Sequence, residues 1–223
     1  MTALRRTRLI RLSDSGWRDV LSRTWDGVAR ECLAHWAAHQ LPLVVTRQTP
    51  HLDDDAIALG LPAPLQWDRL RIALGVPASS LLAPCNFPAA AEIVTQLPLA
   101  ARPGWTALCD RLAGAGVAAQ VYGSHGWQRL TGLRYLHPDS DLDVRLEVDD
   151  DDAADTIAAL LESTRIAQPR IDGEFAFADG RDIAWREWRA WRSGHADRIL
   201  VKRFNDVALE VATAAPAAAA IGA

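Results

Sequence analysis

Two aspartates, Asp141 and Asp143, stand two positions apart in the segment DLDVRLEV (141–148). The segment alternates polar and apolar residues strictly, which is typical of a half-buried β-strand. Successive side chains of a strand point to opposite faces. Both carboxylates therefore lie on one face, ~6–7 Å apart, while Leu142 and Val144 point into the core. Because like charges at this spacing repel unless a cation lies between them, the pair predicts a metal site. Mg²⁺ is the expected ion where phosphate oxygens share its coordination sphere.

A glycine–serine pair precedes these aspartates in the chain. Gly123 and Ser124 follow the apolar segment VAAQVY (117–122) and open a segment predicted to be helical (123–132). Glycine lets a phosphate approach the backbone closely, and a helix N-terminus offers free N–H groups with partial positive charge. The order strand, Gly-Ser, helix, strand, Asp-x-Asp therefore predicts a phosphate-binding turn beside a metal site. For the aspartates alone, an acidic strand face exposed to solvent is the alternative.

A site with two metal ions needs a further carboxylate. Asp172, in the predicted strand RIDGEFAF (170–177), is the favoured candidate, and Glu174 on the same face is the reserve. For either residue, the alternative is a surface charge on an edge strand. The expected catalytic and metal-binding residues are Asp141, Asp143 and Asp172. Cations are also needed to neutralise the leaving phosphates, and the candidates are Lys202, Arg129 and Arg134.

Length, charge and cysteine content limit the class of protein. The 223 residues suit one large domain or two small ones. A net charge of −4 provides no global basic field, so nucleic acid is not an expected partner. The three cysteines are scattered, without zinc-binding spacing or a disulfide framework. No apolar run approaches the ~20 residues of a membrane span. We therefore expect a cytoplasmic protein with no membrane contact.

The first segment, residues 1–98, is predicted to be a smaller N-terminal α+β domain. Apolar residues at helical spacing predict a helix over 17–39. Val44 and Val45 predict a strand in LPLVVTRQ (41–48). The acidic run Asp53–Asp55 is interpreted as the start of a helix that ends at Gly60, because acids in a first turn complement the helix dipole.

A proline-rich stretch (84–103) is the expected boundary, and residues 99–212 form the expected catalytic domain. Its helices and strands alternate, which predicts an α/β (α+β) fold with a mixed sheet. Asp149–Asp152 are expected to cap a helix and not to bind metal. The alanine-rich tail, 213–223, is expected to be flexible. The expected elements are helices at 104–115, 123–132, 149–164 and 181–192, strands at 117–122, 141–148 and 170–177, and a final strand pair around Asn205–Asp206.

The segment VYGSHGWQRLTGLRYLHPDSDLDV (121–144) resembles the active-site block of the malonate decarboxylase holo-acyl-carrier-protein synthase family, also called phosphoribosyl-dephospho-CoA transferase. The likeness extends to RIDGEFAF, AWRE (184–187), ILVK (199–202), LPLVVTRQ and RLRIALGV (69–76), and so covers most of the chain. That family is similar to polymerase-β-type nucleotidyltransferases in its Gly-Ser and Asp-x-Asp motif. The resemblance therefore implies a polymerase-β-like catalytic domain.

The resemblance also implies a reaction. The donor would be 2′-(5″-triphosphoribosyl)-3′-dephospho-CoA, and the acceptor a serine hydroxyl on the acyl carrier subunit of malonate decarboxylase. The product would be a phosphodiester-linked prosthetic group, with release of pyrophosphate. If the resemblance holds, residues 1–98 could dock the carrier protein or the CoA moiety. Carrier proteins are usually acidic, so a basic docking surface is expected. Two clusters could supply it: Arg5, Arg6, Arg8 and Arg11, or Arg186, Arg189 and Arg192.

Two other functions remain open at the level of sequence. The first is a nucleotidyltransferase that uses ATP to adenylylate a protein or a small molecule with the same residues in the same roles. The second is an inactive nucleotide-binding or interaction module. The second would be expected to carry a broken motif, whereas Gly123, Ser124, Asp141 and Asp143 are all present.

Overall fold

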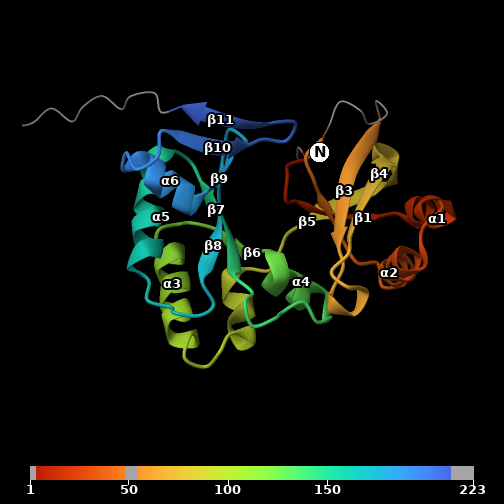
Figure 1. Ribbon diagram of the computed structural model, residues 1–223, viewed down its shortest axis with the longest axis horizontal. Coiled ribbons are helices and arrows are strands. Elements are labelled where there is room, and N and C mark those ends of the chain that lie inside the picture. The colour runs from red at the N-terminus through yellow and green to blue at the C-terminus, as the bar shows by residue number, and fades with distance from the viewer. Residues whose placement is uncertain (1–3, 49–54, 212–223) are drawn as a thin grey trace, which may run out of the picture.

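The computed structural model describes residues 4–48 and 55–211. Each half of the chain builds its own β-sheet, and the two halves lie side by side along the long axis of the molecule (Figure 1). Each sheet has its own hydrophobic core. The chain thus has the α+β fold in two parts that its sequence predicts. Within the described residues, no helix is long and apolar enough to cross a membrane.

The N-terminal sheet has the strand order β4-β3-β2-β1-β5, with all neighbours antiparallel. Trp17 of α1 and Trp36 of α2 are buried in the core of this part. The strand expected around Val44 and Val45 is confirmed as β2. The elements are β1 (Leu9–Leu12), α1 (Asp14–Ser22), α2 (Gly27–Ala38), β2 (Leu43–Val45), β3 (Ala56–Pro62), β4 (Arg71–Pro77), β5 (Leu81–Cys85) and the 3₁₀ helices η1 (Leu65–Trp67) and η2 (Ala78–Ser80).

The C-terminal sheet has the order β11-β10-β9-β8-β7-β6 and is mixed, because β7 and β8 are parallel while the other neighbours are antiparallel. The final strand pair is confirmed as β10 and β11. The elements are η3 (Ala90–Gln96), α3 (Arg102–Gly114), β6 (Ala119–Val121), α4 (Gly123–Thr131), β7 (Leu142–Val148), α5 (Asp151–Ser163), β8 (Ile171–Phe177), β9 (Asp182–Ala184), α6 (Trp185–Arg192), β10 (Arg198–Lys202) and β11 (Val207–Val211).

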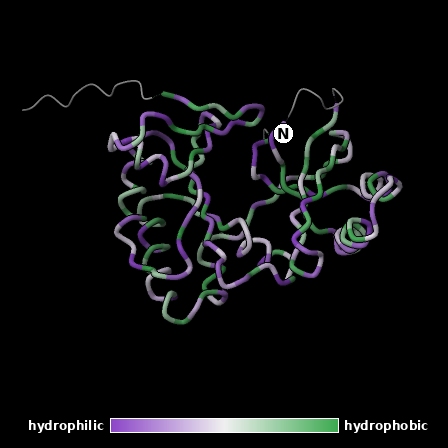
Figure 2. Tube along the Cα trace, viewed as in Figure 1, coloured by the Kyte–Doolittle hydropathy of each residue, from purple (hydrophilic) through white to green (hydrophobic). Residues whose placement is uncertain are grey.

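The two faces of the C-terminal sheet differ in polarity. Leu142, Val144 and Leu146 of β7 are fully buried and pack with α3, α5 and α6. Figure 2 shows hydrophobic and hydrophilic residues interspersed along the chain in both halves of the molecule. The opposite face carries the polar residues of the same strands, including Asp143 and Arg145. The alternation read from the sequence thus turns the carboxylates away from the helices.

The helix expected over 17–39 is wrong as a single element. The structure divides it into α1 and α2, with an extended residue, Arg23, after the end of α1. Asp26 then starts the second helix, because its side chain accepts a hydrogen bond from the backbone N–H of Ala29 at 2.8 Å. An aspartate at this position satisfies a donor that the helix itself leaves free.

The helix expected from Asp53–Asp55 to Gly60 is also wrong where the chain is described. Asp53 and Asp54 lie outside the described residues, as does the tail 213–223. Residues 56–62 form strand β3, which pairs along its full length with β4. A short apolar run suits a strand or a helix equally by pattern. Here the long-range partner RIALGVP decides for the strand, since it offers seven consecutive pairing residues.

The segment expected as a helix over 181–192 is a helix only from Trp185 onward. Before it, residues 182–184 form strand β9, in which Ile183 pairs with Phe175 of β8. Asp182 pairs with Lys202 of β10, so this three-residue strand joins the last hairpin to the sheet. Strands this short carry too little sequence pattern to be recognised before their partners are known.

Side chains from the C-terminal part complete the N-terminal core. Trp127 of α4 and Tyr135 are buried there, and Phe87 packs edge-on against Trp127. The Tyr135 hydroxyl donates a hydrogen bond to the carbonyl of Pro62 at 2.8 Å. A second link runs from Arg145 Nε to Thr7 Oγ1 at 3.2 Å. These contacts fix the two parts against each other, so a cavity between them has defined walls.

Candidate active site

Three carboxylates gather at one end of the parallel strands β7 and β8. Asp143 lies on β7, Asp141 immediately precedes that strand, and Asp172 of β8 is the register partner of Asp143. Partners in neighbouring strands point to the same face, and the intervening Leu142 is buried on the other face. The structure thus brings together the three acids that the sequence singles out. Their chemical roles remain predictions.

The Gly-Ser turn lies directly against these acids. Helix α4 begins at Gly123, and the N–H of Tyr122 donates to the carbonyl of Asp143 at 3.0 Å. Gly123 has a φ of +58°, in the left-handed region that favours glycine. A Cβ at this position would lie 1.9 Å from Oδ2 of Asp143. The helix N-terminus and the half-buried Asp143 carboxylate are therefore in contact, as the predicted phosphate and metal sites require.

Both parts of the chain line the cavity in front of this turn, which has a volume of about 540 Å³. That volume is within the ~300–1,000 Å³ typical of small-molecule sites. The C-terminal part contributes Gly123, Ser124, Asp141 and Asp143. The remaining walls are Thr7, Val44, Pro62, Ala63, Arg69, Arg71 and Phe87 from the N-terminal side, and Tyr122, Trp127, Tyr135, His137, Asp139 and Ser140.

The pKa values of Asp143 and Asp141 shift in opposite directions, and of the two only Asp141 is paired with an arginine. Burial raises the pKa of Asp143 to about 6, and the neighbouring carboxylates of Asp172 and Asp141 add to the effect. Hydrogen bonds from Arg170 lower the pKa of Asp141. The Arg170 guanidinium binds Asp141 through two nitrogens, at 3.2 and 2.6 Å, and its Nη2 also lies 3.2 Å from Asp172. A cationic group therefore already bridges two of the three acids.

The donor set fits a hard divalent cation, because carboxylate oxygens are the ligands that Mg²⁺ prefers. In residues 4–48 and 55–211, no three His, Cys, Asp or Glu side chains are arranged as a set of metal ligands. Arg170 instead forms ion pairs with Asp141 and Asp172. Its side chain is 56% exposed and can move aside. The half-buried Asp143 has no cation of its own in direct contact among the described residues, which leaves a charge for an ion to neutralise.

The reserve acid and the predicted cations lie outside this cavity. Glu174 is buried and forms an ion pair with Lys202. Arg129 lies on the surface, 3.5 Å from Glu92. The backbone carbonyl of Arg134 accepts a hydrogen bond from Leu65, and its side chain does not line the cavity. None of these three cations is brought to the acids.

Three other arginines, which sequence reasoning missed, lie at the acids or line the cavity in front of them. Arg170 contacts the acids directly. Arg69 and Arg71 line the cavity from the N-terminal part. Asp68 and Arg69 both have positive φ values, 51° and 57°, so the tight turn before β4 is held in a conformation rare for such residues. The signal in the sequence is the pair of arginines that opens the apolar segment RLRIALGV.

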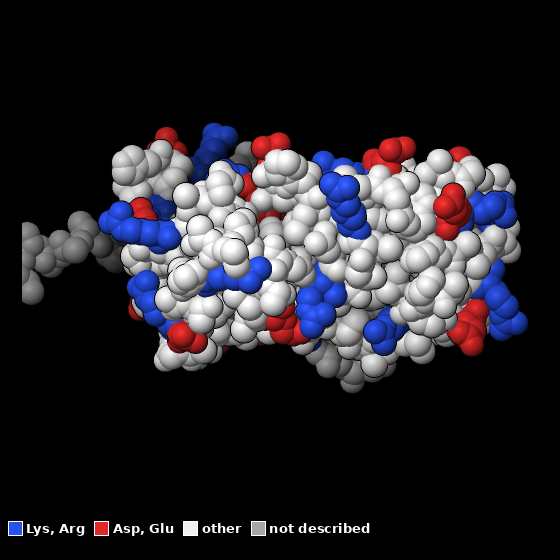
Figure 3. Space-filling view, turned by 90° about the horizontal axis from the view of Figure 1, so that it is seen from below, with Lys and Arg blue, Asp and Glu red and all other residues white. Residues whose placement is uncertain are grey.

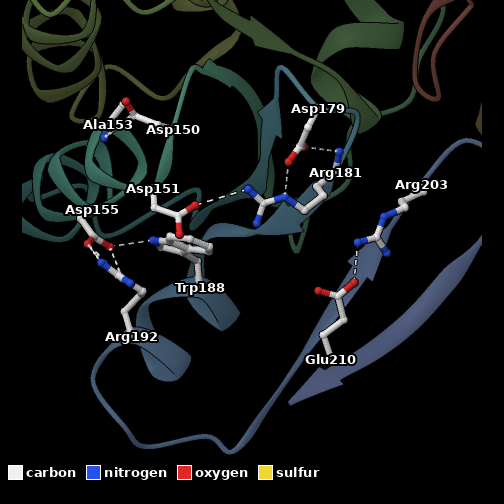
Figure 4. Close-up of polar contacts among 10 residues, drawn as sticks. All are labelled: Asp150, Asp151, Ala153, Asp155, Asp179, Arg181, Trp188, Arg192, Arg203 and Glu210. Carbon is white, nitrogen blue, oxygen red and sulfur yellow. Dashed lines mark hydrogen bonds and ion pairs between the residues drawn. The ribbon is translucent and has the colours of Figure 1, made fainter. Parts of the chain in front are cut away.

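The acidic run after β7 has a structural role, as expected. Asp150 caps α5 by accepting a hydrogen bond from the N–H of Ala153 at 2.8 Å. Asp151 pairs with Arg181 at 3.3 Å. Figure 4 shows Asp150 beside Ala153 at the start of α5 and Asp151 joined to Arg181, which precedes β9.

A cavity that combines carboxylates, a helix N-terminus behind Gly-Ser and arginines is suited to phosphorylated substrates, and it defines the class of group-transferring enzymes that act on them. The family described as "Phosphoribosyl-dephospho-CoA transferase MdcG C-terminal domain" matches residues 86–213. The corresponding "MdcG N-terminal domain" matches residues 5–87. The chain belongs to the phosphoribosyl-dephospho-CoA transferase family, and it is a transferase.

Curated relatives with that name come from several bacteria. The protein from Bradyrhizobium diazoefficiens is 35% identical over 206 residues, which cover 90% of this chain and 87% of the relative. The protein from Xanthomonas euvesicatoria is 32% identical over 190 residues, which cover 83% and 87%. A relative from Pseudomonas aeruginosa is 35% identical over 103 residues, covering 45% and 47%. No solved structure matches the chain.

Proposed function

We propose that this enzyme transfers the phosphoribosyl-dephospho-CoA group from 2′-(5″-triphosphoribosyl)-3′-dephospho-CoA to a serine of the malonate decarboxylase acyl carrier protein, with release of pyrophosphate. The observation that carries the proposal is the contact between Gly123 and Asp143 in a cavity lined by both parts of the chain. Membership of the phosphoribosyl-dephospho-CoA transferase family supports the proposed identity of the transferred group. The cytoplasmic location expected from the sequence stays a prediction.

In this proposal the donor phosphates lie at the start of α4. The backbone N–H groups at the start of α4 and the hydroxyl of Ser124 bind phosphate oxygens. Arg69 and Arg71 of the N-terminal part neutralise the remaining phosphate charge. Asp141, Asp143 and Asp172 would hold Mg²⁺, which when bound offsets charge on the transferred and leaving phosphates. In this proposal Arg170 releases the half-buried Asp141 and Asp172 as the donor binds.

The chemical step is an in-line displacement. The serine oxygen forms a bond to the α-phosphorus while the bond from that phosphorus to the pyrophosphate oxygen breaks. The serine proton passes to one of the carboxylates at the strand ends. Asp172 is the favoured third acid over Glu174, because Glu174 is occupied by Lys202. The protein contributes mainly by positioning the donor and by charge stabilisation.

The carrier protein is proposed to dock beside α6. A groove of about 260 Å³ lies there and is lined by Arg170, Arg186 and Arg189, together with Glu162, which forms an ion pair with Arg189. Arg170 connects the groove to the acids, because it also binds Asp141 and Asp172. Arg192 of the same cluster is bound to Asp155, at 2.5 Å, as Figure 4 shows. In the N-terminal cluster, Arg5 donates to backbone carbonyls at the end of β8. Figure 3 shows mixed charges on the face that it presents, so docking would depend on a local groove.

Mass spectrometry of a purified carrier subunit tests the proposal. After incubation with enzyme, Mg²⁺ and the proposed donor, the carrier should gain the mass of the phosphoribosyl-dephospho-CoA group. A carrier whose serine is replaced by alanine should gain nothing. Transfer of AMP from ATP at a comparable rate would instead favour the adenylylating alternative and contradict the proposal.

A further inference from the structure

A second, smaller cavity adjoins the active-site cavity. It has a volume of about 200 Å³ and shares two wall residues, His137 and Ser140, with the larger cavity. Small-molecule sites that hold a whole ligand usually have ~300–1,000 Å³. The smaller cavity is therefore suited to one ring system of a ligand whose remainder lies in the larger one.

Buried polar atoms without partners concentrate at this cavity. In residues 4–48 and 55–211, seven buried side-chain nitrogen or oxygen atoms lack a hydrogen-bond partner. Three of them belong to its walls: both ring nitrogens of His125 and Oε1 of Gln96. His125 is only 2% exposed. Because buried polar groups are nearly always paired, this cluster indicates that a hydrogen-bonding group is missing here.

The protonation state of His125 suits a neutral partner. Burial lowers the pKa of His125 to about 4, so the imidazole is uncharged at neutral pH. An uncharged imidazole offers one donor and one acceptor. The Gln96 oxygen adds an acceptor, and Gln168, which also lines the cavity, adds an amide. The partner that satisfies this set has donors and acceptors side by side and no charge.

The other walls are apolar and include three rings of fixed shape. Pro98, Pro138 and Pro169 line the cavity together with Leu136. Proline rings are rigid and offer flat apolar surfaces, against which a planar ring packs without loss of hydrogen bonds. Flat apolar walls combined with a mixed polar edge are the features expected around a heteroaromatic base.

We propose that this cavity is the subsite for the adenine base of the dephospho-CoA donor, an assignment that rests on the proposed function. The base presents an exocyclic amino group, which donates, beside a ring nitrogen, which accepts. Gln96 would accept from the amino group and His125 would donate to the ring nitrogen. His125 lies on α4, the helix whose first residue is Gly123. The first turn of α4 would thus contact both the adenine base and the phosphates of the same donor molecule.

The test compares the binding of two ligands that differ only in the base. 3′-Dephospho-CoA carries adenine, and its deaminated analogue carries hypoxanthine, in which a carbonyl oxygen replaces the amino group. The wild-type enzyme should bind the adenine form at least tenfold more tightly by calorimetry, because the analogue would direct an acceptor at Gln96. A site built to bond a group discriminates strongly against a ligand that lacks it.

Gln96→Leu and Gln168→Leu should reduce this preference to within about twofold, since each removes one amide from the cavity wall. His125→Phe should do the same if it folds, and the two glutamine variants keep the test decisive if it does not. Gln66→Leu, at an exposed glutamine away from both cavities, is the matched control and should keep the wild-type preference.

The result that would overturn the subsite is an unchanged preference in both glutamine variants, which would place the base in the larger cavity. Equal binding of the two bases by the wild type would equally overturn it and indicate a void filled by water. Transfer to the carrier protein is measured on the same preparations. Normal transfer with no base preference would refute only the subsite, whereas absent transfer with a clear base preference would refute only the proposed reaction.

Discussion

Gly123 and Asp143 are in contact so close that no side chain fits between them: a Cβ on Gly123 would lie 1.9 Å from Oδ2 and 2.8 Å from Cγ of Asp143. The glycine also has a φ of +58°, which other residues rarely adopt. This relationship places the start of α4 and the Asp-x-Asp strand end in one site. It also makes the geometry of the site sensitive to a single added methyl group.

Gly123→Ala is expected to reduce transfer about 100-fold or more, because the added Cβ displaces the Asp143 carboxylate and small misplacements are costly in catalysis. Gly132→Ala is the matched control. Gly132 ends the same helix with a φ of +71° and has open space around it, so it shares the backbone strain without the clash. Gly132→Ala should lose about 1–2 kcal/mol of stability through backbone strain, and Gly123→Ala should lose more because of the clash. Equal losses of transfer activity in the two variants would contradict the prediction, because backbone strain and not the clash with Asp143 would then explain the loss.

Asp143→Asn is expected to stabilise the protein above neutral pH in the absence of metal. The folded state raises the pKa of Asp143 from 3.8 to about 6, so it disfavours the ionised form. Wild-type stability relative to the variant therefore falls as pH rises from about 4 to about 6, and the difference stays constant above about 7. Its size should be on the order of 2–3 kcal/mol, measured by urea unfolding. A difference that shrinks as pH rises would contradict the burial of this charge.

Mg²⁺ with inorganic triphosphate is expected to raise the Tm of the wild type by about 5–10 °C at one hundred times the Kd. The double variant Asp141→Asn, Asp143→Asn should lose this shift, because it removes two of the three proposed metal ligands. Asp110→Asn with Asp197→Asn removes the same charge at exposed positions and should retain it. An undiminished shift in the first pair would locate the metal elsewhere, and undiminished transfer would locate the chemistry elsewhere.

Arg189→Glu is expected to slow transfer to the carrier protein several-fold at low salt, with a smaller effect at high salt, because exposed charges steer association and salt screens them. Arg11→Glu tests the competing N-terminal cluster and should have little effect. Binding of 3′-dephospho-CoA, measured alongside, should not change in either variant. If Arg11→Glu shows the salt-dependent loss instead, the carrier docks on the N-terminal part.

The sequence by itself determined the local parts of the site. Period-two alternation puts Asp141 and Asp143 on one face and Leu142 in the core, and this depends only on strand geometry. The Gly-Ser pair at the start of α4 could be recognised for the same reason, since glycine and helix-start preferences act within a few residues. The α+β class and the mixed C-terminal sheet also followed from the local patterns of apolar residues.

Only the tertiary structure decided which distant residues join that site. Asp172 stands beside Asp143 because β8 pairs in parallel with β7, and Arg69 reaches the cavity because Trp127 and Tyr135 anchor the C-terminal part in the N-terminal core. The same holds for β3, whose apolar run became a strand through its pairing with β4. These contacts join residues far apart in the chain, so their free energy leaves no local pattern, whereas helix starts and strand faces are set by neighbouring residues.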